Sequence, residues 1–270
     1  MPVTLITGCS SGIGLALARV FKHAGHTVWA TARQPKDVVR LADEGFRARQ
    51  LDVNDETALV ALAAELGQLD ILINNAGYGT MGPLLDGGVA TIRQQFETNV
   101  FSIVGVTRAL LPLLRSSRGL VVNIGSVSWA VVTPFAGAYC ASKAAVHSVS
   151  DALRMELAPF GIRVLEVQPG AIDTQFASNA SREAEQVIAE GSPWWSLQAH
   201  IRARARASQD RPTPVAELVG AVLAAVQKPK TPRLIRVGYG SRALPWLGRW
   251  VPKGVLEWAL KRKFGLNRSL

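Results

Sequence analysis

Cysteine and histidine are scarce in this sequence, which has 2 cysteines and 4 histidines among 270 residues. Two cysteines are too few for the disulfide framework of a small secreted protein. No histidine pair has HExxH spacing or neighbouring cysteines, which are the arrangements that commonly bind zinc. The histidines are His23, His26, His147 and His200. The sequence therefore predicts neither a disulfide-stabilised fold nor a metal site.

Long apolar runs are also missing. No stretch of about 18 uncharged apolar residues occurs, which is roughly the length that a membrane-spanning helix needs. The chain enters a strand pattern directly after Met1-Pro2, so the pattern predicts no signal peptide and a cytoplasmic protein. With 48% hydrophobic residues over 270 positions, we expect one large α/β domain with a substantial core.

The excess of positive charge is confined to the end of the chain. Residues 1–199 carry 15 Lys/Arg and 17 Asp/Glu, whereas residues 200–270 carry 15 Lys/Arg and 3 Asp/Glu. No zinc-finger, RRM or KH pattern accompanies this positive charge, so nucleic acid is not the expected partner. Tryptophans alternate with lysines and arginines over residues 242–264. This composition is typical of a segment at a membrane surface, although the same tryptophans could cover a substrate pocket or form a subunit contact.

Short apolar runs alternate with helical patterns along most of the chain. Such alternation predicts a Rossmann-type, doubly wound parallel sheet of about seven strands flanked by helices. The expected strands are 3–7, 27–31, 47–51, 69–73, 120–124, 163–167 and 234–237. We expect residues 1–240 to form one catalytic domain that contains a long, irregular substrate loop at 171–211. Residues 241–270 then form a basic, tryptophan-rich tail.

A glycine-rich turn separates the first expected strand from the first helix, with glycines at positions 8, 12 and 14. Glycines at such a turn let backbone N–H groups and the positive helix end approach a phosphate. The pattern Gly8-x-Ser10-x-Gly12 also matches a hydrolase nucleophile elbow. That alternative lacks an earlier strand-to-helix loop to supply an oxyanion donor, and only His200 could complete a triad from the late part of the chain.

The end of the second expected strand reads Ala32-Arg33-Gln34. Folds that bind NAD commonly place an acidic residue there for the ribose 2′-hydroxyl, whereas an arginine suits the 2′-phosphate of NADP. Asp52, at the end of the third strand, could accept a hydrogen bond from an adenine amino group. The sequence therefore predicts NADP(H) as the cofactor.

Tyr139 and Lys143 are four residues apart in an expected helix, so their side chains share one face. A cation near the phenol should lower its pKa and suit it to proton transfer near neutral pH. Ser126 follows the fifth strand and could hydrogen-bond the same substrate oxygen. Asn99 lies in the middle of the helical pattern 89–114, where we expect a local helix break with a bound water.

The ordered set of these motifs, together with Asn74-Asn75-Ala76-Gly77 and Pro169-Gly170, resembles the short-chain dehydrogenase/reductase family over about residues 1–240. The resemblance implies that Tyr139 is the general acid/base, that Lys143 binds the nicotinamide ribose and lowers the tyrosine pKa, that Ser126 holds the carbonyl, and that Asn99 anchors a relay water. It implies cofactor contacts from Tyr139, Lys143 and a further set: Gly8, Ser10, Ser11, Gly12, Ile13, Gly14, Arg33, Asp52, Val53, Asn75, Ala76, Gly77, Pro169, Gly170, Ile172 and Thr174.

The expected activity is hydride transfer from NADPH to the carbonyl of a hydrophobic small molecule. Residues 78–84 and the tail are similar to the family branch that reduces retinoids, steroids and acyl-dihydroxyacetone phosphates. A dimer or tetramer is expected from the resemblance. The alternative is a non-enzymatic NADP-binding sensor or scaffold that docks through its basic tail; a missing serine, tyrosine or lysine would favour it, and all three are present.

Overall fold

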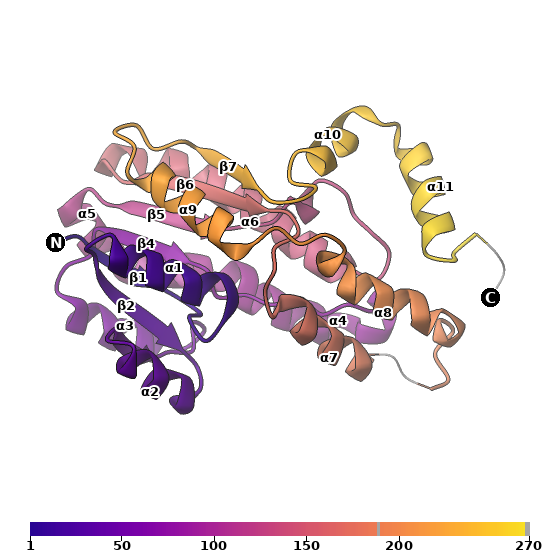
Figure 1. The fold of residues 1–270 in the computed structure, drawn as a ribbon, viewed down its shortest axis with the longest axis horizontal. Coiled ribbons are helices and arrows are strands. Elements are labelled where there is room, and N and C mark those ends of the chain that lie inside the picture. Colours follow the sequence, from indigo (N-terminus) through magenta and orange to yellow (C-terminus); the bar gives the residue numbers. More distant parts are fainter. Residues whose placement is uncertain (188–189, 268–270) are drawn as a thin grey trace.

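A sheet of seven parallel strands forms the centre of the molecule in this computed structural model, which describes residues 1–187 and 190–267 (Figure 1). The strand order is β3-β2-β1-β4-β5-β6-β7. The strands are β1 (Val3–Ile6), β2 (Thr27–Ala32), β3 (Arg47–Gln50), β4 (Ile71–Asn74), β5 (Leu120–Ile124), β6 (Arg163–Pro169) and β7 (Leu234–Val237). Both the predicted fold class and the seven strands are confirmed.

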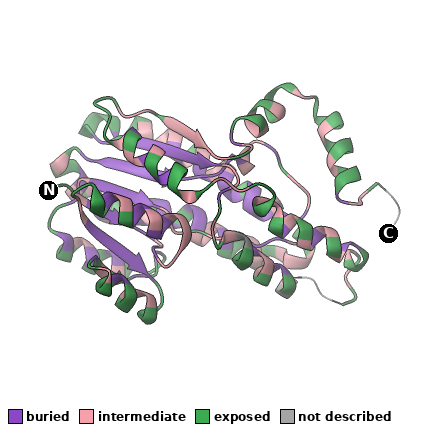
Figure 2. Cartoon of the chain, in the orientation of Figure 1, coloured by how far each residue is buried: buried purple, intermediate pink, exposed green. Residues whose placement is uncertain are grey.

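Helices cover both faces of the sheet, which is why the central strands are buried and mostly apolar (Figure 2). Every residue of β4 and β5 is buried. One core cluster joins the sheet to α1 (Gly12–His23), α2 (Pro35–Asp43) and α9 (Val215–Val226). A second cluster joins the opposite face to α3 (Glu56–Leu66), α5 (Ser102–Ser117) and the end of α6 (Gly137–Glu156).

The helical pattern predicted over residues 89–114 is not one helix. It divides into α4 (Leu84–Phe96), a π-helical turn η1 (Glu97–Phe101) and α5. The expected break therefore occurs at Asn99. Together, α4, η1 and α5 form a continuous helical stretch, Leu84–Ser117. By length and composition this stretch could cross a membrane, and 39% of its most apolar window is buried. Its α5 part supplies Val106, Leu110 and Leu114 to the core, so packing against the sheet accounts for their apolar character.

The segment 171–211, expected to be an irregular loop, is largely helical where the structure describes it. It contains α7 (Phe176–Val187) and α8 (Gln198–Arg206), together with the short turns η4 (Trp195–Leu197) and η5 (Ala207–Gln209). Apolar residues of α7 and α8 pack over Tyr139 and Cys140 in a third core cluster. Their buried faces are made largely of small residues, Ala180, Ala184 and Ala205, so the apolar stripe is weak in the sequence.

The tail forms α10 (Ala243–Trp250) and α11 (Lys253–Lys263), which project from the body as an arm (Figure 1). Trp246, Trp250 and Trp258 of this arm are 59%, 65% and 63% exposed, so none of them is buried against the rest of the protein. Phe264 instead packs into the third cluster, with its ring edge-on to Phe135 at 6.1 Å between centroids. The end of the tail therefore supports the cover over Tyr139.

Candidate active site

The predicted site residues gather along one edge of the sheet, because parallel strands end on the same side. Gly8 follows β1, Arg33 follows β2, Asn75 follows β4 and Ser126 follows β5. Residues Asp52 and Val53 follow β3, and Pro169 ends β6. Ligands of open parallel sheets bind beyond these carboxyl ends, where the strand order reverses. Here the reversal lies between β1 and β4.

The turn between β1 and α1 fits a pyrophosphate. Ser11 caps α1 without a side-chain hydrogen bond, and the first turn has no acidic residue, so its N–H groups remain free for an anion. A methyl group on Gly8 would lie 2.9 Å from the Ala76 Cα. On Gly14 it would lie 2.3 Å from the Gly8 carbonyl oxygen. The glycines therefore allow a close approach of backbone that side chains would block. Ser10 and Ile13 complete this turn.

Asn75 secures this turn rather than projecting into solvent. Its side-chain amide donates to the backbone carbonyls of Thr7 and Gly8 at 2.9 and 3.0 Å. The Thr7 hydroxyl accepts from the backbone N–H groups of Asn75 and Ala76 at 3.0 Å each. Thr7 thus joins the ends of β1 and β4, a role that the sequence analysis missed although the residue directly precedes Gly8.

Two arginines lie near the glycine turn, at the carboxyl-end edge of the sheet. Arg33 is exposed, and its charge reaches Tyr78, whose pKa is raised by burial and by Glu183 and lowered by Arg33. Arg40, on α2, donates to the Ser10 carbonyl at 2.5 Å. The sequence analysis missed Arg40, and no local motif marks it. Two arginines near this turn fit a phosphate better than they fit a bare ribose hydroxyl.

The structure also places the other predicted cofactor residues at this edge of the sheet. A methyl group on Gly12 would lie 3.4 Å from the Thr174 Cβ, so Thr174 lies directly against the glycine turn. Asp52 is exposed and accepts from the Asn54 N–H at 3.0 Å. Ile172 is buried, and Gly170 passes so close to the Tyr239 carbonyl that a methyl group would lie 2.1 Å from its oxygen.

Ser126, Tyr139 and Lys143 come together beneath the α7–α8 cover, and all three are buried. The Ser126 hydroxyl donates to the Ser128 hydroxyl at 3.1 Å and lies close enough to the Tyr139 phenol to lower its pKa. The Lys143 Nζ lies 6.0 Å from the centroid of the Tyr139 ring and donates to the Ile124 carbonyl at 3.0 Å. The Phe176 ring closes the other side of Tyr139 at 5.5 Å between centroids.

The pKa of Tyr139 departs from its ordinary value in the direction opposite to the prediction. Burial raises it, while the nearby Ser126 hydroxyl and the charge of Arg204 act more weakly to lower it. Lys143 does not have the expected effect, because its ammonium group is directed to the Ile124 carbonyl. Burial also lowers the pKa of Lys143 to about 8. Tyr139 is therefore a protonated phenol at neutral pH, which is the form that a proton donor requires.

Asn99 is committed to protein contacts through its side chain. Its amide oxygen accepts from the Tyr78 N–H at 3.0 Å, and its nitrogen donates to the Tyr78 carbonyl and the Ser142 hydroxyl at 2.9 and 3.0 Å. Ser142 in turn donates to the Tyr139 carbonyl at 2.8 Å. Asn99 thus connects η1, the loop after β4 and the first turns of α6. The predicted bound water at Asn99 stays a prediction.

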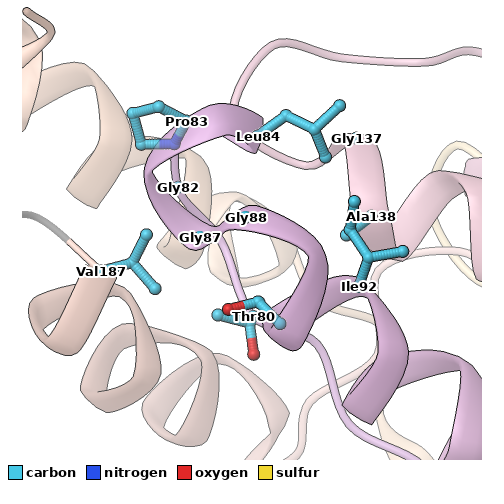
Figure 3. Close-up of a pocket in the computed structure, with 11 residues that line it drawn as sticks. Thr80, Gly82, Pro83, Leu84, Gly87, Gly88, Ile92, Gly137, Ala138 and Val187 are labelled. Carbon is cyan, nitrogen blue, oxygen red and sulfur yellow. The ribbon is translucent and has the colours of Figure 1, made fainter.

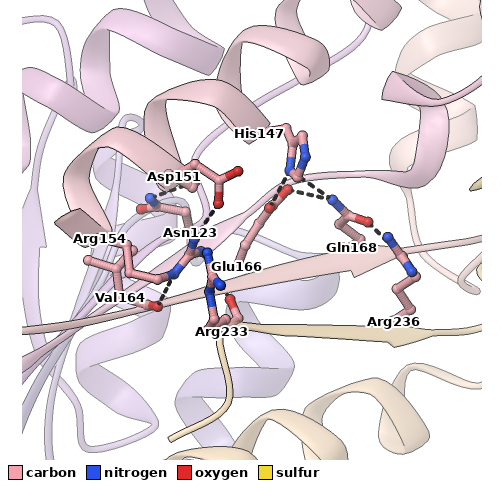
Figure 4. A network of polar contacts seen from close by, with 10 residues as sticks. Asn123, His147, Asp151, Arg154, Val164, Glu166, Gln168, Arg233 and Arg236 are labelled. Carbon is pink, nitrogen blue, oxygen red and sulfur yellow. Dashed lines mark hydrogen bonds and ion pairs between the residues drawn. The ribbon is translucent and has the colours of Figure 1, made fainter.

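A polar network around the buried Glu166 joins α6, β6 and β7 (Figure 4). Glu166 of β6 is 1% exposed and bonds His147 of α6 and Gln168 at 2.7 and 2.8 Å. Gln168 accepts from Arg236 of β7 at 2.9 Å. The charge of Glu166 raises the pKa of Lys143, against the larger effect of burial. Glu166 and Gln168 are two apart on an apolar strand, a signal that the sequence analysis did not use.

This network gives a prediction about pH. Lys143 is charged below pH 8 and loses its charge above it, so activity that needs the ammonium group should fall as the pH rises through about 8. Replacing Glu166 with glutamine removes the charge that favours the ammonium form. We expect the alkaline fall in kcat/KM to move to lower pH, with activity at pH 6 retained. Initial rates from pH 5.5 to 10 measure this.

The control is Asp151→Asn. Asp151 lies on α6, the helix that carries Lys143, and its half-exposed carboxylate pairs with Arg154. The pH profile of this variant should match the unmodified protein. If the pH profile of Glu166→Gln also matches that of the unmodified protein, the role assigned to Glu166 is wrong.

A small crevice opens beside the start of α6, between α4 and Val187 of α7 (Figure 3). Gly137 and Ala138, which directly precede Tyr139, form one wall. The crevice encloses about 10 Å³, which is room for one water molecule and not for a substrate. It belongs to the packing around Tyr139 rather than to a separate site.

The hydrolase alternative finds no support. Ser10 lies in the turn after β1, whereas the His200 ring lies against Gly265 near the end of the tail, 2.9 Å from where a methyl group on that glycine would be. In the described ranges 1–187 and 190–267, no His, Cys, Asp and Glu side chains cluster in a way that could hold a metal ion.

Comparisons with known proteins agree with this geometry. A family model described as short chain dehydrogenase matches residues 2–185. A short-chain dehydrogenase/reductase from Pestalotiopsis microspora is 31% identical over 97% of this chain and 94% of its own. The crystal structure of a short-chain dehydrogenase from Streptomyces avermitilis superposes with a TM-score of 0.82, at 33% identity and 98% coverage of both chains.

A further solved structure, a short chain dehydrogenase from Burkholderia cenocepacia in complex with NADP, has a TM-score of 0.74 and 26% identity, covering 96% of this chain and 97% of that one. The family-model match extends over more than half of the sequence, and the fold and the placement of the motifs agree with it. This chain belongs to the short-chain dehydrogenase/reductase family of oxidoreductases.

Proposed function

We propose that this protein is an NADPH-dependent reductase that converts the carbonyl group of a hydrophobic small molecule to a secondary alcohol. The observation that carries the proposal is the convergence of Ser126, Tyr139 and Lys143 beneath an apolar cover. NADPH supplies the hydride when it is bound. Ser126 orients the carbonyl oxygen, and Tyr139, held protonated by burial, donates the proton to that oxygen.

The residues that would hold the cofactor follow from their positions at the carboxyl ends of the strands. The backbone of residues 8–14 would receive the pyrophosphate, and Thr174 lies against Gly12 of this turn. Arg33 would bind the 2′-phosphate, Asp52 the adenine, and Lys143 the nicotinamide ribose. The NADP complex of the Burkholderia cenocepacia relative supports this choice of cofactor.

The cover supports a large, apolar substrate of lipid, retinoid or steroid type. Met81, Phe135, Leu197 and Ile201 share a buried apolar cluster with Tyr139 and come from three separate parts of the chain. The substrate branch rests on the resemblance of residues 78–84 and the tail. A sensor or scaffold remains the second candidate, and no observation in the structure favours it over the enzyme.

The test is coenzyme oxidation, followed at 340 nm with NADPH and with NADH over a panel of lipid, retinoid and steroid carbonyls. We expect turnover with preference for NADPH. Arg33→Asp should reverse that preference by roughly 10- to 100-fold, because it removes a charge-assisted bond to phosphate and adds repulsion. Arg163→Asp makes the same charge change at the opposite edge of the sheet and should leave the preference unaltered. Preference for NADH in the unmodified protein would contradict the role of Arg33.

The tail supports a second part of the proposal, that a cytoplasmic protein docks on anionic membranes. Arg249 lies over the Trp250 ring at 5.5 Å and Arg262 over the Trp258 ring at 5.8 Å, so apolar and cationic groups share the exposed arm. Sedimentation with vesicles should show binding to phosphatidylserine-containing vesicles and little to neutral ones. The double change Trp250→Ser and Trp258→Ser should abolish it.

Val60→Ser, which removes an equally exposed apolar residue from α3, should leave vesicle binding intact. Equal sedimentation of the tail variant and the unmodified protein would contradict docking through the arm. A subunit contact through this arm is the alternative; light scattering of the purified chain and the tail variant distinguishes it. We also propose that the protein forms a homodimer or homotetramer, as expected for its family, and the same light scattering measures this.

A further inference from the structure

Arg204 is a cation turned toward Tyr139. It lies in the last turn of α8, and its Nε donates to the Thr133 hydroxyl at 2.6 Å. The residues around it on α8, Ile201 and Ala205, are buried in the cluster that contains Tyr139 and Cys140. Arg204 is half-buried by exposed area, and burial lowers the pKa of its guanidinium.

The neighbouring arginines show that this orientation is specific to Arg204. Arg202 forms an ion pair with Glu185 of α7 at 2.7 Å, and Arg206 is exposed. In the part of the chain that the structure describes, Arg204 forms no ion pair with a carboxylate. The ionisable groups whose charge it feels are Cys140 and Tyr139. The charged end of an arginine side chain usually reaches water. Directing part of the Arg204 guanidinium toward an apolar cluster that holds no anion therefore costs free energy of desolvation.

The loop that carries Thr133 is held in a strained form. Phe135 has a φ of +63°, which is unusual for a bulky side chain. Its carbonyl accepts from the Gly82 N–H at 2.8 Å, and its ring packs against Phe264 of the tail. Such strain persists where the surrounding packing determines it, and it is frequent at ligand sites. Thr133 therefore presents its hydroxyl to Arg204 from a fixed position.

We propose that Arg204 binds an anionic group of the substrate, a carboxylate or a phosphate, next to the carbonyl that Tyr139 protonates. Thr133 accepts from Nε, and the other side chain that bonds the guanidinium is the Cys140 thiol, a weak acceptor. A carboxylate or phosphate is a stronger acceptor, and two of its oxygens match the two terminal nitrogens. The apolar residues of α7 and α8 that cover Tyr139 would contact the rest of the substrate. The inference rests on the proposed function and narrows it to amphiphilic carbonyl compounds with the anion close to the carbonyl.

The experiment compares matched substrates. Medium-chain oxo-carboxylates with the carbonyl at C2, C4 or C5 are assayed against their methyl esters, and oxoalkyl phosphates against the uncharged oxo-alcohols. We expect the protein to prefer at least one anionic member by about 30- to 100-fold in kcat/KM, the usual effect of a charge-assisted pair. Arg204→Met should lower kcat/KM for the anionic member at least about 10-fold more than for its ester. Arg206→Met, on the same helix, should alter neither.

A binding measurement separates this inference from the proposed function. Decanoate and decanamide are titrated against the protein and followed by tryptophan fluorescence, with no turnover needed. Tighter binding of decanoate or decyl phosphate that is lost in Arg204→Met supports the inference even where no carbonyl is reduced. Equal binding and equal rates for charged and uncharged members overturn it, even where carbonyls are reduced. A loss in Arg204→Met that is the same for acid and ester also overturns it, because the arginine would then serve only the packing of α8.

Discussion

Replacing Tyr139 with phenylalanine should lower kcat for carbonyl reduction by about 10²- to 10⁴-fold, the usual contribution of a positioned acid. The Tyr139 phenol is buried, burial raises its pKa, and the Ser126 hydroxyl lies close enough to lower that pKa in part. A water molecule therefore cannot easily replace the phenol as proton donor. The phenylalanine ring keeps the contact with Phe176. NADPH binding, measured by fluorescence titration, should therefore change little.

Tyr239→Phe is the matched control, since it removes the hydroxyl of a half-exposed tyrosine on the loop after β7. It should retain full activity. Thermal unfolding of both variants checks that neither change disturbs the fold. Undiminished reduction by Tyr139→Phe would exclude Tyr139 as the proton donor and leave the family chemistry without its acid in this chain.

Replacing Gly14 with alanine should cost about 3 kcal/mol of stability and weaken NADPH binding on the order of 100-fold. The added methyl group would lie 2.3 Å from the Gly8 carbonyl oxygen and 2.4 Å from the Asn75 amide nitrogen. Neither atom can withdraw easily, because the amide of Asn75 is bonded to the carbonyls of Thr7 and Gly8. The whole turn must therefore shift, together with the N–H groups that would hold the pyrophosphate.

Gly220→Ala provides the control, because Gly220 is also helical, is exposed and has no atom within 4 Å of an added methyl group. It should raise stability by up to about 1 kcal/mol, since alanine favours helix over glycine. Urea unfolding measures both free energies, and NADPH fluorescence measures both affinities. A Gly14→Ala protein as stable as Gly220→Ala would contradict the close packing of the turn.

Local sequence determined the strands and the glycine turn, but not α7 and α8. Runs such as Leu120 to Ile124 read as strands because they are apolar and β-branched, and all seven were found. The glycine turn and the four-residue spacing of Tyr139 and Lys143 depend only on backbone geometry within a few residues. Both can therefore be recognised from the sequence. The parallel sheet then placed the strand ends at one edge without further information.

Only the tertiary structure decided the energies and contacts that depend on distant segments. The direction of the Tyr139 pKa follows from burial beneath α7 and α8, which begin 37 and 59 residues later in the chain. The approach of Arg204 to Thr133 and of Glu166 to Lys143, and the exposure of the tail tryptophans, arise in the same way. Periodicity reports which face of a helix is buried, but burial and Coulomb energy depend on what other segments pack against that face.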